Sequence, residues 1–330
     1  MIRNAQIVAS GMYVPERVLP NSFFNELLGE DVDTWLRENL TIRERRWCNE
    51  NQSTADLCVE AAKRILDDAK LSADKIDLLI IATDTPEYIS PSTASVVQYR
   101  LGAVNAGTFD INTACAGFVT ALDVASKFII ADKKYNNVLV IGAYAMSKYL
   151  NMQDKKTVTL FADGAAGVLL QPTDKADKGF LTSKLFTDGQ YCDWMGIYAG
   201  GTHMPVTHEV IDRKDHLLKF VKKFPKETNP TTWTRMIKEA CEELNIKPTD
   251  IDHYFFTQIN INSIWETLDN LEVDRKKGYA IMDRYAYTGS ACIPMTFDET
   301  RRKGLIKEND LCLFIGSGGG LAFALAIFKM

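Results

Sequence analysis

The sequence predicts an α/β protein built from two duplicated halves. An Ile-Asp pair directly precedes an apolar strand at Asp77 and again, 175 residues later, at Asp252. A second apolar strand that ends in glycine also recurs, with Gly142 and Gly316 lying 174 residues apart. A nearly constant offset of this kind is typical of an internal repeat. The alternative is chance similarity between two ordinary βα units.

The expected elements follow the repeat. Apolar residues at helical spacing predict a helix before each Ile-Asp pair, over 55–66 and 234–244, and alternating or continuous apolar runs predict strands at 1–10, 78–83, 138–142, 253–258 and 311–316. The first strand is too short in its apolar part for a signal peptide. We expect two halves, 1–172 and 173–330. The segment from about 184 to 232 has no counterpart in the first half and is predicted to be an insertion of loops that covers the site.

The composition argues against several classes of function. With 330 residues and 46% hydrophobic content, the chain can bury a large core. A net charge of −5 with no basic block argues against a nucleic-acid partner, and no apolar run approaches the ~20 residues of a membrane span. Seven cysteines without a C-x-x-C pair argue against a metal site or a disulfide framework and predict a cytoplasmic protein.

Cys115 is the candidate nucleophile. An apolar run reaches this cysteine among small residues, and helical spacing then begins at Phe118. A thiol at the start of a helix is expected to have a lowered pKa, and the small neighbours Ala114, Ala116 and Gly117 would leave its sulfur open. The alternative is a structural cysteine, because free cysteines are among the most buried residues.

Two features of the second half are expected near this cysteine. A shift of 175 residues from Cys115 leads to Ser290, so the two helix starts should face each other if the halves pack with pseudo-symmetry. The glycine run 318–320 follows a strand, and successive glycine amides can converge on an anion. The alternative for the glycine run is a tight connection between two strands.

Several motifs resemble those of one family. The chain is similar to the thiolase superfamily and, within it, to β-ketoacyl-ACP synthase III, the FabH-like enzymes. The resemblance runs nearly from end to end and rests on segments 42–46, 82–86, 91–94, 110–118, 161–169 and 316–320. Each motif is weak alone, but their order around Cys115 is specific for the superfamily.

The resemblance implies a thiolase-like five-layered αβαβα fold and, usually, a homodimer. It also implies acyl transfer in two steps, in which Cys115 takes an acyl group from acyl-CoA or an acyl carrier protein and then passes it on. The N–H groups of Cys115 and Gly319 would stabilise the oxyanion. No metal and no cofactor besides these substrates is implied.

The chain departs from the family at the other catalytic positions. The family's His position holds Thr257 and its Asn position holds Tyr287, whereas Asn260 is retained. Hydroxyl groups donate hydrogen bonds but are poor bases near neutral pH, so acylation should survive better than decarboxylative condensation. The histidines of the inserted segment are either a replacement base or surface residues; they are His203, His208 and His216.

Carrier recognition is altered as well. Trp35 falls on the Trp position that grips the adenine end of coenzyme A in the family, but Asn39 falls on the Arg position. Arg43 is a candidate substitute, with Arg37 and Arg45 beside it, and the alternative for these arginines is a solvated surface. We assign Trp35, Arg43 and Ser290 to substrate binding.

Three functions are compatible with this sequence. The first is an acyltransferase of specialised metabolism that is acylated at Cys115 and transfers the acyl group to a carbon, oxygen or nitrogen nucleophile. The second is a decarboxylating ketosynthase in which Thr257, Tyr287 and Asn260 replace the usual pair. The third is a non-catalytic subunit of a heterodimeric synthase.

Overall fold

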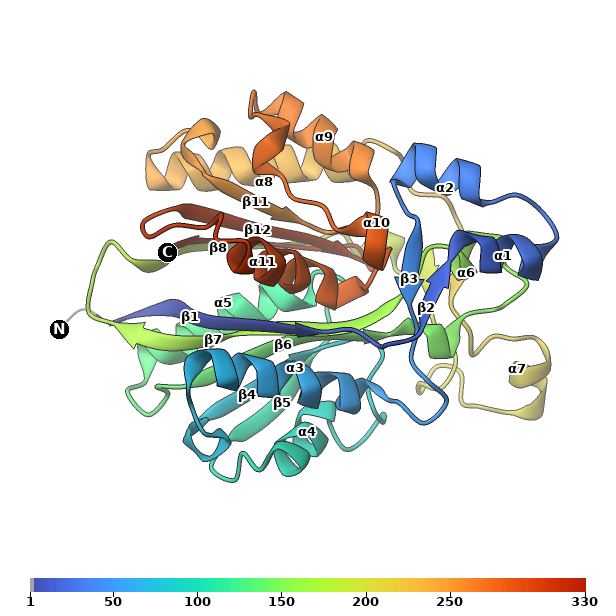
Figure 1. Ribbon diagram of the computed structural model, residues 1–330, viewed down its shortest axis with the longest axis horizontal. Helices are drawn as coiled ribbons and strands as arrows, with labels where there is room; N and C mark the ends of the chain where they lie inside the picture. The colour runs from blue at the N-terminus through green and yellow to red at the C-terminus, as the bar shows by residue number, and fades with distance from the viewer. Residues whose placement is uncertain (1–2) are drawn as a thin grey trace.

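The computed structural model describes residues 3–330 and is built around two large β-sheets separated and flanked by helices (Figure 1). The five-stranded sheet has the order β1 (Asn4–Tyr13), β7 (Asp163–Thr173), β6 (Val138–Ala145), β4 (Leu78–Ala82), β5 (Gly107–Ile111). The four-stranded sheet has the order β8 (Gly179–Thr187), β13 (Ala322–Lys329), β12 (Leu311–Gly318), β11 (His253–Phe256). Residues 1 and 2 of the predicted first strand lie outside the described residues.

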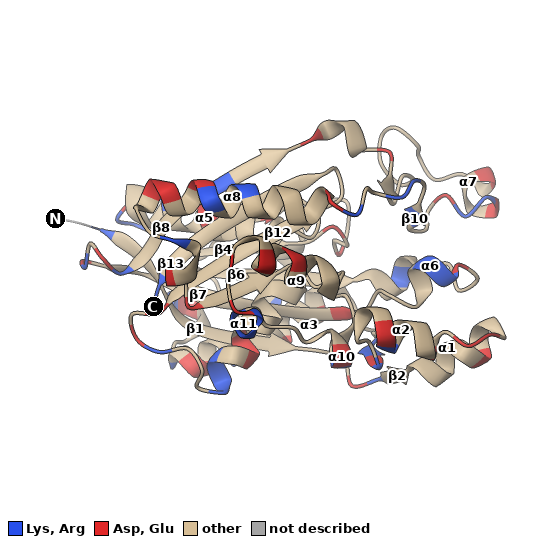
Figure 2. Ribbon diagram, turned by 90° about the horizontal axis from the view of Figure 1, so that it is seen from above, with Lys and Arg blue, Asp and Glu red and all other residues tan. Residues whose placement is uncertain are grey.

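Three helical layers complete the five-layered αβαβα fold that the sequence predicted (Figure 1). Helices α5 (Gly117–Ala131) and α11 (Cys292–Arg302) lie between the sheets and contact both of them. Helices α3 (Thr54–Ala69) and α4 (Thr93–Leu101) cover the outer face of the larger sheet, and α8 (Thr228–Leu244) and α9 (Ile261–Asn270) cover that of the smaller one. Charged residues occur mainly on helices and loops, including the C-terminal part of α11, and the central strands are almost free of them (Figure 2).

The two sheets repeat one topology. In the larger sheet β1, β7 and β6 are antiparallel neighbours, and β6, β4 and β5 run parallel. In the smaller sheet β8, β13 and β12 are antiparallel neighbours, and β12 and β11 run parallel. Where a counterpart of β5 would lie, the second half has only a single bridge between Tyr254 and Gly278. The sequence repeat therefore corresponds to a repeated strand order.

Local sequence explains the elements that position the site. Helix α3 begins with a capping box, in which Ser53 and Asp56 bond each other's backbone N–H groups. Strand β4 is buried along its whole length, as expected for a central parallel strand between two helical layers. The smaller elements are β2 (Val18–Pro20), α1 (Asn21–Leu28), α2 (Asp33–Leu40), β3 (Glu44–Arg46), α6 (Lys155–Val158), β9 (Met195–Gly196), α7 (His208–Asp212), β10 (Lys219–Phe220) and α10 (Met282–Tyr285).

The chain passes from the first sheet to the second between Thr173 and Gly179. The predicted division into 1–172 and 173–330 lies close to this crossing and stays a prediction. Of the predicted insertion, residues 184–187 belong to β8 and residues 228–232 to α8. The segment between these two elements, residues 188–227, is called the cover segment below.

One apolar window is longer than the sequence analysis allowed. Residues Ala114–Ala131, 18 residues that include α5, have the length and mean hydropathy of a membrane span, with a hydropathy of 1.6. In the structure 67% of this window is buried, because α5 is the helix between the two sheets. Its apolar character is therefore explained by the protein core.

Candidate active site

The loop that carries Cys115 connects β5 to α5. Two backbone hydrogen bonds form its turn: Ala116 N donates to Thr113 O (3.1 Å) and Gly117 N donates to Ala114 O (2.9 Å). Ala114 has a positive φ of 45°, a conformation that side chains with a Cβ rarely adopt. The helix begins two residues after Cys115. The loop therefore presents the cysteine just before the N-terminus of the central helix.

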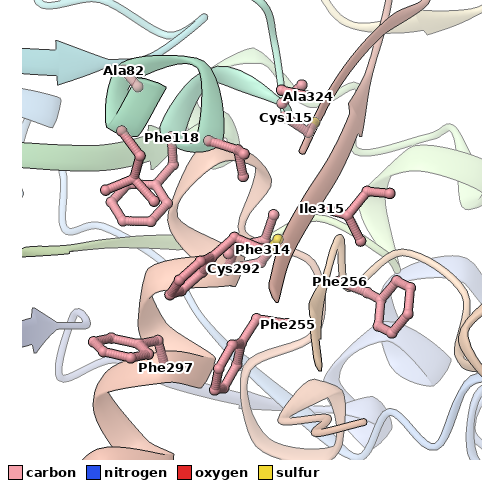
Figure 3. Packing of buried hydrophobic residues seen from close by; sticks show 14 of the residues in the cluster. Ala82, Cys115, Phe118, Phe255, Phe256, Cys292, Phe297, Phe314, Ile315 and Ala324 are labelled. Atoms are coloured by element: carbon pink, nitrogen blue, oxygen red, sulfur yellow. The ribbon is translucent and has the colours of Figure 1, made fainter. Parts of the chain in front are cut away.

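The end of β12 packs directly on this loop. A Cβ atom added to Gly318 would lie 2.6 Å from Cys115 N and 2.6 Å from Thr113 O, and one added to Gly316 would lie 2.9 Å from Ala116 Cα. Only glycine permits so close an approach of two backbones. Figure 3 shows residues of both halves in one cluster around this contact, including Phe118 of the first half and Cys292 and Phe314 of the second.

The two helix starts face each other, as the repeat predicted. Ser290, which occupies the position equivalent to Cys115, donates a hydrogen bond from Oγ to Ala114 O (2.9 Å). Its side chain is fully buried. Ser290 thus holds the loop that carries Cys115, and its predicted part in substrate binding stays a prediction.

The surroundings of Cys115 differ from those expected. Its side chain is only 1% exposed, so the small neighbours do not leave the sulfur open in this structure. Burial, together with the nearby Asp84 carboxylate, raises the pKa of the Cys115 thiol well above its ordinary value, and a hydrogen bond with the Tyr287 side chain acts in the opposite direction. The expected lowering of the pKa is therefore wrong, because loss of hydration outweighs the position beside a helix start.

Tyr287 of the second half is the side chain that acts to lower the pKa of the Cys115 thiol. Its backbone pairs with the other half through Tyr287 N to Leu160 O (3.0 Å) and Ala162 N to Tyr287 O (2.8 Å). Its ring centroid is 5.5 Å from that of Phe161. Burial raises the pKa of Tyr287 well above its ordinary value, so its hydroxyl stays protonated and can act as a hydrogen-bond donor to sulfur at neutral pH.

Thr257 and Asn260 have local partners. The fully buried Thr257 hydroxyl accepts a hydrogen bond from Ser317 N (2.9 Å) and faces Ser317 O at 3.5 Å. The Asn260 side chain accepts a hydrogen bond from Asn262 N (3.0 Å) and caps α9. Both positions were predicted to be catalytic, and that assignment stays a prediction.

The cover segment lies against the site residues. Met195 O would be 3.4 Å from a Cβ added to Gly319, and the Phe220 ring centroid is 6.2 Å from that of Phe161. These contacts agree with a segment that covers the site. Of its three histidines, His203 and His208 are exposed and His216 is partly buried.

The predicted carrier-binding residues lie apart from the buried cysteine. Trp35 on α2 is 54% exposed and Arg43 is exposed. Arg37 is paired with Asp33 (2.7 Å). Arg45 is fully buried with its guanidinium 4.2 Å from the centre of the Phe24 ring, and burial lowers its pKa to about 9. Of the three arginines, Arg43 is therefore the one best placed to meet a ligand.

Asp84 was not among the predicted site residues. Its carboxylate charge raises the pKa of the Cys115 thiol. Asp84 is the second residue after β4, and its Oδ1 is inaccessible to solvent and has no hydrogen-bond partner among residues 3–330. An acidic residue shortly after a fully apolar strand, at the sheet edge where Cys115 was expected, was the available signal. Within the same residues, no group of three or more His, Cys, Asp or Glu side chains is placed to hold a metal ion.

Family models match both parts of the chain. The model described as 3-oxoacyl-[acyl-carrier-protein (ACP)] synthase III matches residues 109–189, and the model of the C-terminal part of the same synthase matches residues 241–330. The first match contains Cys115, and the second contains Thr257, Tyr287 and the glycine run.

Full-length relatives and solved structures agree with these models. The β-ketoacyl-[acyl-carrier-protein] synthase III of Clostridioides difficile strain 630 is 37% identical over 100% of this chain and 99% of its own length. The crystal structure of 3-oxoacyl-[acyl-carrier-protein] synthase III from Aquifex aeolicus VF5 matches with a TM-score of 0.88 at 28% identity, covering 99% of this chain and 100% of that one. The priming β-ketosynthase of the R1128 polyketide biosynthetic pathway has the same fold, with a TM-score of 0.88 at 23% identity, covering 100% of this chain and 97% of that one.

Proposed function

The chain belongs to the β-ketoacyl-[acyl-carrier-protein] synthase III family and is an acyltransferase, and from that premise we propose that Cys115 is its nucleophile. Cys115 takes an acyl group from acyl-CoA or an acyl carrier protein as a thioester and passes it to a second nucleophile. The observation that carries the proposal is the close contact of the Cys115 loop with the end of β12. A Cβ atom added to Gly318 of β12 would lie only 2.6 Å from Cys115 N. Gly319, the next residue, supplies the second oxyanion N–H beside that of Cys115.

Tyr287 orients the sulfur in this proposal. Its side chain acts to lower the pKa of the Cys115 thiol, and because the pKa of Tyr287 itself is raised, its hydroxyl remains a donor across the neutral pH range. A donor of this kind stabilises a thiolate but cannot accept the thiol proton. Tyr287 is therefore assigned to positioning and stabilisation rather than to proton abstraction.

The second step is proposed to proceed without decarboxylation. By resemblance, Thr257 and Tyr287 occupy the family's His and Asn positions, which donate hydrogen bonds to the enolate that forms when carbon dioxide leaves. Here the Thr257 hydroxyl is bonded to the Ser317 backbone and Asn260 caps α9, so neither supports a replacement enolate site. We therefore favour transfer to a carbon, oxygen or nitrogen nucleophile in specialised metabolism.

Trp35 and Arg43 are proposed to bind the carrier of the acyl group. Both side chains are exposed, as contact with a coenzyme A nucleotide or a carrier protein requires. Asn39, on the family's Arg position, donates a hydrogen bond to Trp35 O (3.0 Å) and accepts one at its own carbonyl from Asn262 (3.0 Å). Asn39 thus fixes the local backbone and leaves the anionic end of the carrier to Arg43.

A homodimer through the edge of the larger sheet is part of the proposal. Strand β5 is the last strand of that sheet and, among residues 3–330, pairs only with β4. Large apolar side chains are exposed on the segments that flank it: Tyr88 (51%), Ile89 (83%), Tyr99 (85%) and Val104 (72%). An unpaired strand beside exposed apolar residues is a typical site for pairing with a second copy.

The dimer is tested by sedimentation of the wild type and of an Ile89→Glu, Tyr99→Glu double variant. The wild type should sediment as a dimer and the variant as a monomer. Leu305→Glu is the matched control, because Leu305 is exposed (45%) but lies after α11, away from β5. A monomeric wild type would instead favour a heterodimer with a second chain.

The nucleophile is tested by intact mass spectrometry after incubation with a panel of acyl-CoA and acyl-ACP donors. The wild type and Cys192→Ala should gain one acyl mass, and Cys115→Ala should gain none. Cys192 is the matched control because it is the exposed cysteine among the seven, all of which lie within residues 3–330. An adduct that persists in Cys115→Ala, or no adduct with any donor, would refute the assignment. Carbon dioxide release from malonyl-ACP would show that the second step is decarboxylative after all.

A further inference from the structure

Asp84 lies at the same sheet edge as Cys115. Strand β4 runs parallel to both neighbours, so its carboxyl end meets the carboxyl ends of β5, which leads to Cys115, and of β6. Two hydrogen bonds bracket the aspartate: Thr83 N donates to Ile111 O (3.1 Å) and Ala145 N donates to Thr85 Oγ1 (2.9 Å). The backbone of Asp84 is thus tied to both neighbouring strands at the point where the nucleophile loop begins.

One oxygen of the carboxylate has no structural partner, whereas Asp84 as a whole is partly exposed. Its Oδ1 is buried without a hydrogen bond, and no Lys or Arg of the described chain forms an ion pair with it. The neighbouring hydroxyls are used elsewhere, because Thr83 Oγ1 accepts from Thr85 N (3.0 Å) and lies 3.3 Å from Thr85 Oγ1. A buried carboxylate oxygen without a hydrogen bond destabilises a fold. Its presence therefore calls for a function.

The titratable groups around Asp84 come from both halves. Its charge raises the pKa of Cys115 on the nucleophile loop, of Tyr144 on β6 and of Tyr149 in the turn after β6. Tyr287 and Cys292 of the second half face the cysteine, and both have raised pKa values. All of these groups stay protonated near pH 7. Asp84 is thus the group of this set that titrates in the neutral range, because burial raises its pKa to about 6.

We propose that Asp84 is the general base for acylation of Cys115, which rests on the proposed nucleophile. The carboxylate accepts the thiol proton, directly or through one water, while the sulfur forms its bond to the donor's carbonyl carbon. The carbon–sulfur bond to the carrier then breaks, and the leaving thiolate takes the proton back from Asp84. One thiol is consumed and one is released, and the carboxylate is regenerated. Asp84 thus supplies the base that Thr257 and Tyr287 do not.

The test is single-turnover acylation by acetyl-CoA, or by the best donor of the panel, over pH 5–9. At pH 7 Asp84→Asn should acylate about 10²–10⁴-fold more slowly than the wild type, and Asp84→Glu should recover part of the rate. The wild-type rate should rise with pH through an inflection near pH 6 that Asp84→Asn lacks. Asp298→Asn is the control for loss of a buried carboxylate, since Asp298 pairs with Arg302 (2.8 Å) and not with the site. An unchanged rate and pH profile in a folded Asp84→Asn would overturn the proposal.

Alkylation by iodoacetamide separates this inference from the proposed function, because it needs no acyl donor. In a Cys192→Ala background, alkylation of Cys115 should follow the same inflection near pH 6. With Asp84→Asn it should be at least 10-fold slower at pH 7 and rise only as the thiol itself ionises. If no donor acylates Cys115 but alkylation still depends on Asp84, the proposed acyl transfer is refuted. The assignment of Asp84 as the acceptor of the Cys115 proton is then retained. Equal alkylation rates in both proteins would refute the proton acceptor whatever the donor result.

Discussion

The two halves differ in how the side chains that follow their parallel strands β11 and β4 are hydrogen-bonded. After β11, Thr257 accepts from Ser317 N (2.9 Å), and the Gln258 side chain donates to Phe256 O (3.1 Å) and Tyr279 O (3.0 Å) and accepts from Ile281 N (3.1 Å). After β4, the equivalent edge carries Asp84 with a buried oxygen that has no partner among the described residues.

The same contrast applies to the two central helices. Ser290, before α11, uses its hydroxyl to hold the Ala114 carbonyl, whereas the buried thiol of Cys115, before α5, has a pKa that Asp84 raises and Tyr287 lowers. Buried polar groups in proteins are nearly always satisfied, and exceptions need an explanation. In the proposed function, the second half therefore serves as the scaffold that shapes the site, and the first half carries the reactive groups.

The largest expected effect comes from adding a methyl group where the two halves are in closest contact. Gly318→Ala places a Cβ 2.6 Å from both Cys115 N and Thr113 O, which are backbone atoms that cannot move aside without shifting the nucleophile loop. We expect a loss of about 3 kcal/mol or more in the free energy of unfolding and an acylation rate at least 100-fold lower. Denaturant unfolding and single-turnover acylation measure the two effects.

Gly201→Ala is the matched control for that substitution. A Cβ at Gly201 meets no atom within 4 Å, so stability and acylation should stay within error of the wild type. Equal behaviour of the two variants would show that the halves do not meet as closely as the structure indicates.

The pH dependence of the free energy of unfolding of Asp84→Asn tests whether the carboxylate in the first half lacks a structural partner. Burial raises the pKa of Asp84 from 3.8 to about 6, so between these pH values the unfolded chain loses the proton while the folded chain keeps it. The wild type therefore loses stability as pH rises from about 4 to about 6 and is unaffected by this group at higher pH. The neutral amide does not ionise. We expect Asp84→Asn to match the wild type at pH 4 and to exceed it by about 2 kcal/mol at pH 8, allowing for partial exposure of the side chain.

Thermal and denaturant unfolding at pH 4, 6 and 8 check this prediction. A variant that is slower in acylation but more stable above pH 6 is the pattern expected of a residue kept for function. A variant that is less stable at pH 8 would instead mean that the carboxylate has a structural partner, and the contrast between the halves would disappear.

Thr257→Val tests the scaffold side of the same comparison. The substitution keeps the shape but leaves the buried Ser317 N without the hydroxyl that it bonds at 2.9 Å. We expect a loss of about 1.5 kcal/mol in the free energy of unfolding, with acylation reduced less than 10-fold. Thr257→Ser, which keeps the hydroxyl, should recover most of the stability. A 100-fold loss of acylation with stability unchanged would assign Thr257 to catalysis instead.

Much of this architecture is predictable from sequence because the strands and the central helix are strongly apolar and recur at a constant offset. The meeting of Ser290 with the Cys115 loop follows from that offset alone. The state of the thiol does not, because its pKa depends on how tightly side chains from distant segments pack around it. The helix start at Gly117 favours a low pKa, but burial dominates. Likewise, the sequence can show an acidic residue after an apolar strand, but that Asp84 Oδ1 lacks a hydrogen bond is visible only in three dimensions.

The smallest expected effect is that of Ser290→Ala, the counterpart of the substitution at Cys115. The hydroxyl donates one buried hydrogen bond to Ala114 O (2.9 Å), so its removal should cost about 1 kcal/mol in the free energy of unfolding. Because Ser290 holds the nucleophile loop rather than reacting, we expect acylation of Cys115 to fall by no more than about 5-fold, measured by single-turnover mass spectrometry, whereas Cys115→Ala abolishes it. Ser290→Thr, which restores a hydroxyl in a crowded position, should lose stability without regaining rate if packing against Gly142 and Gly117 limits the site. Loss of acylation in Ser290→Ala comparable to that in Cys115→Ala would mean that both helix starts are reactive and that the division of labour between the halves is wrong.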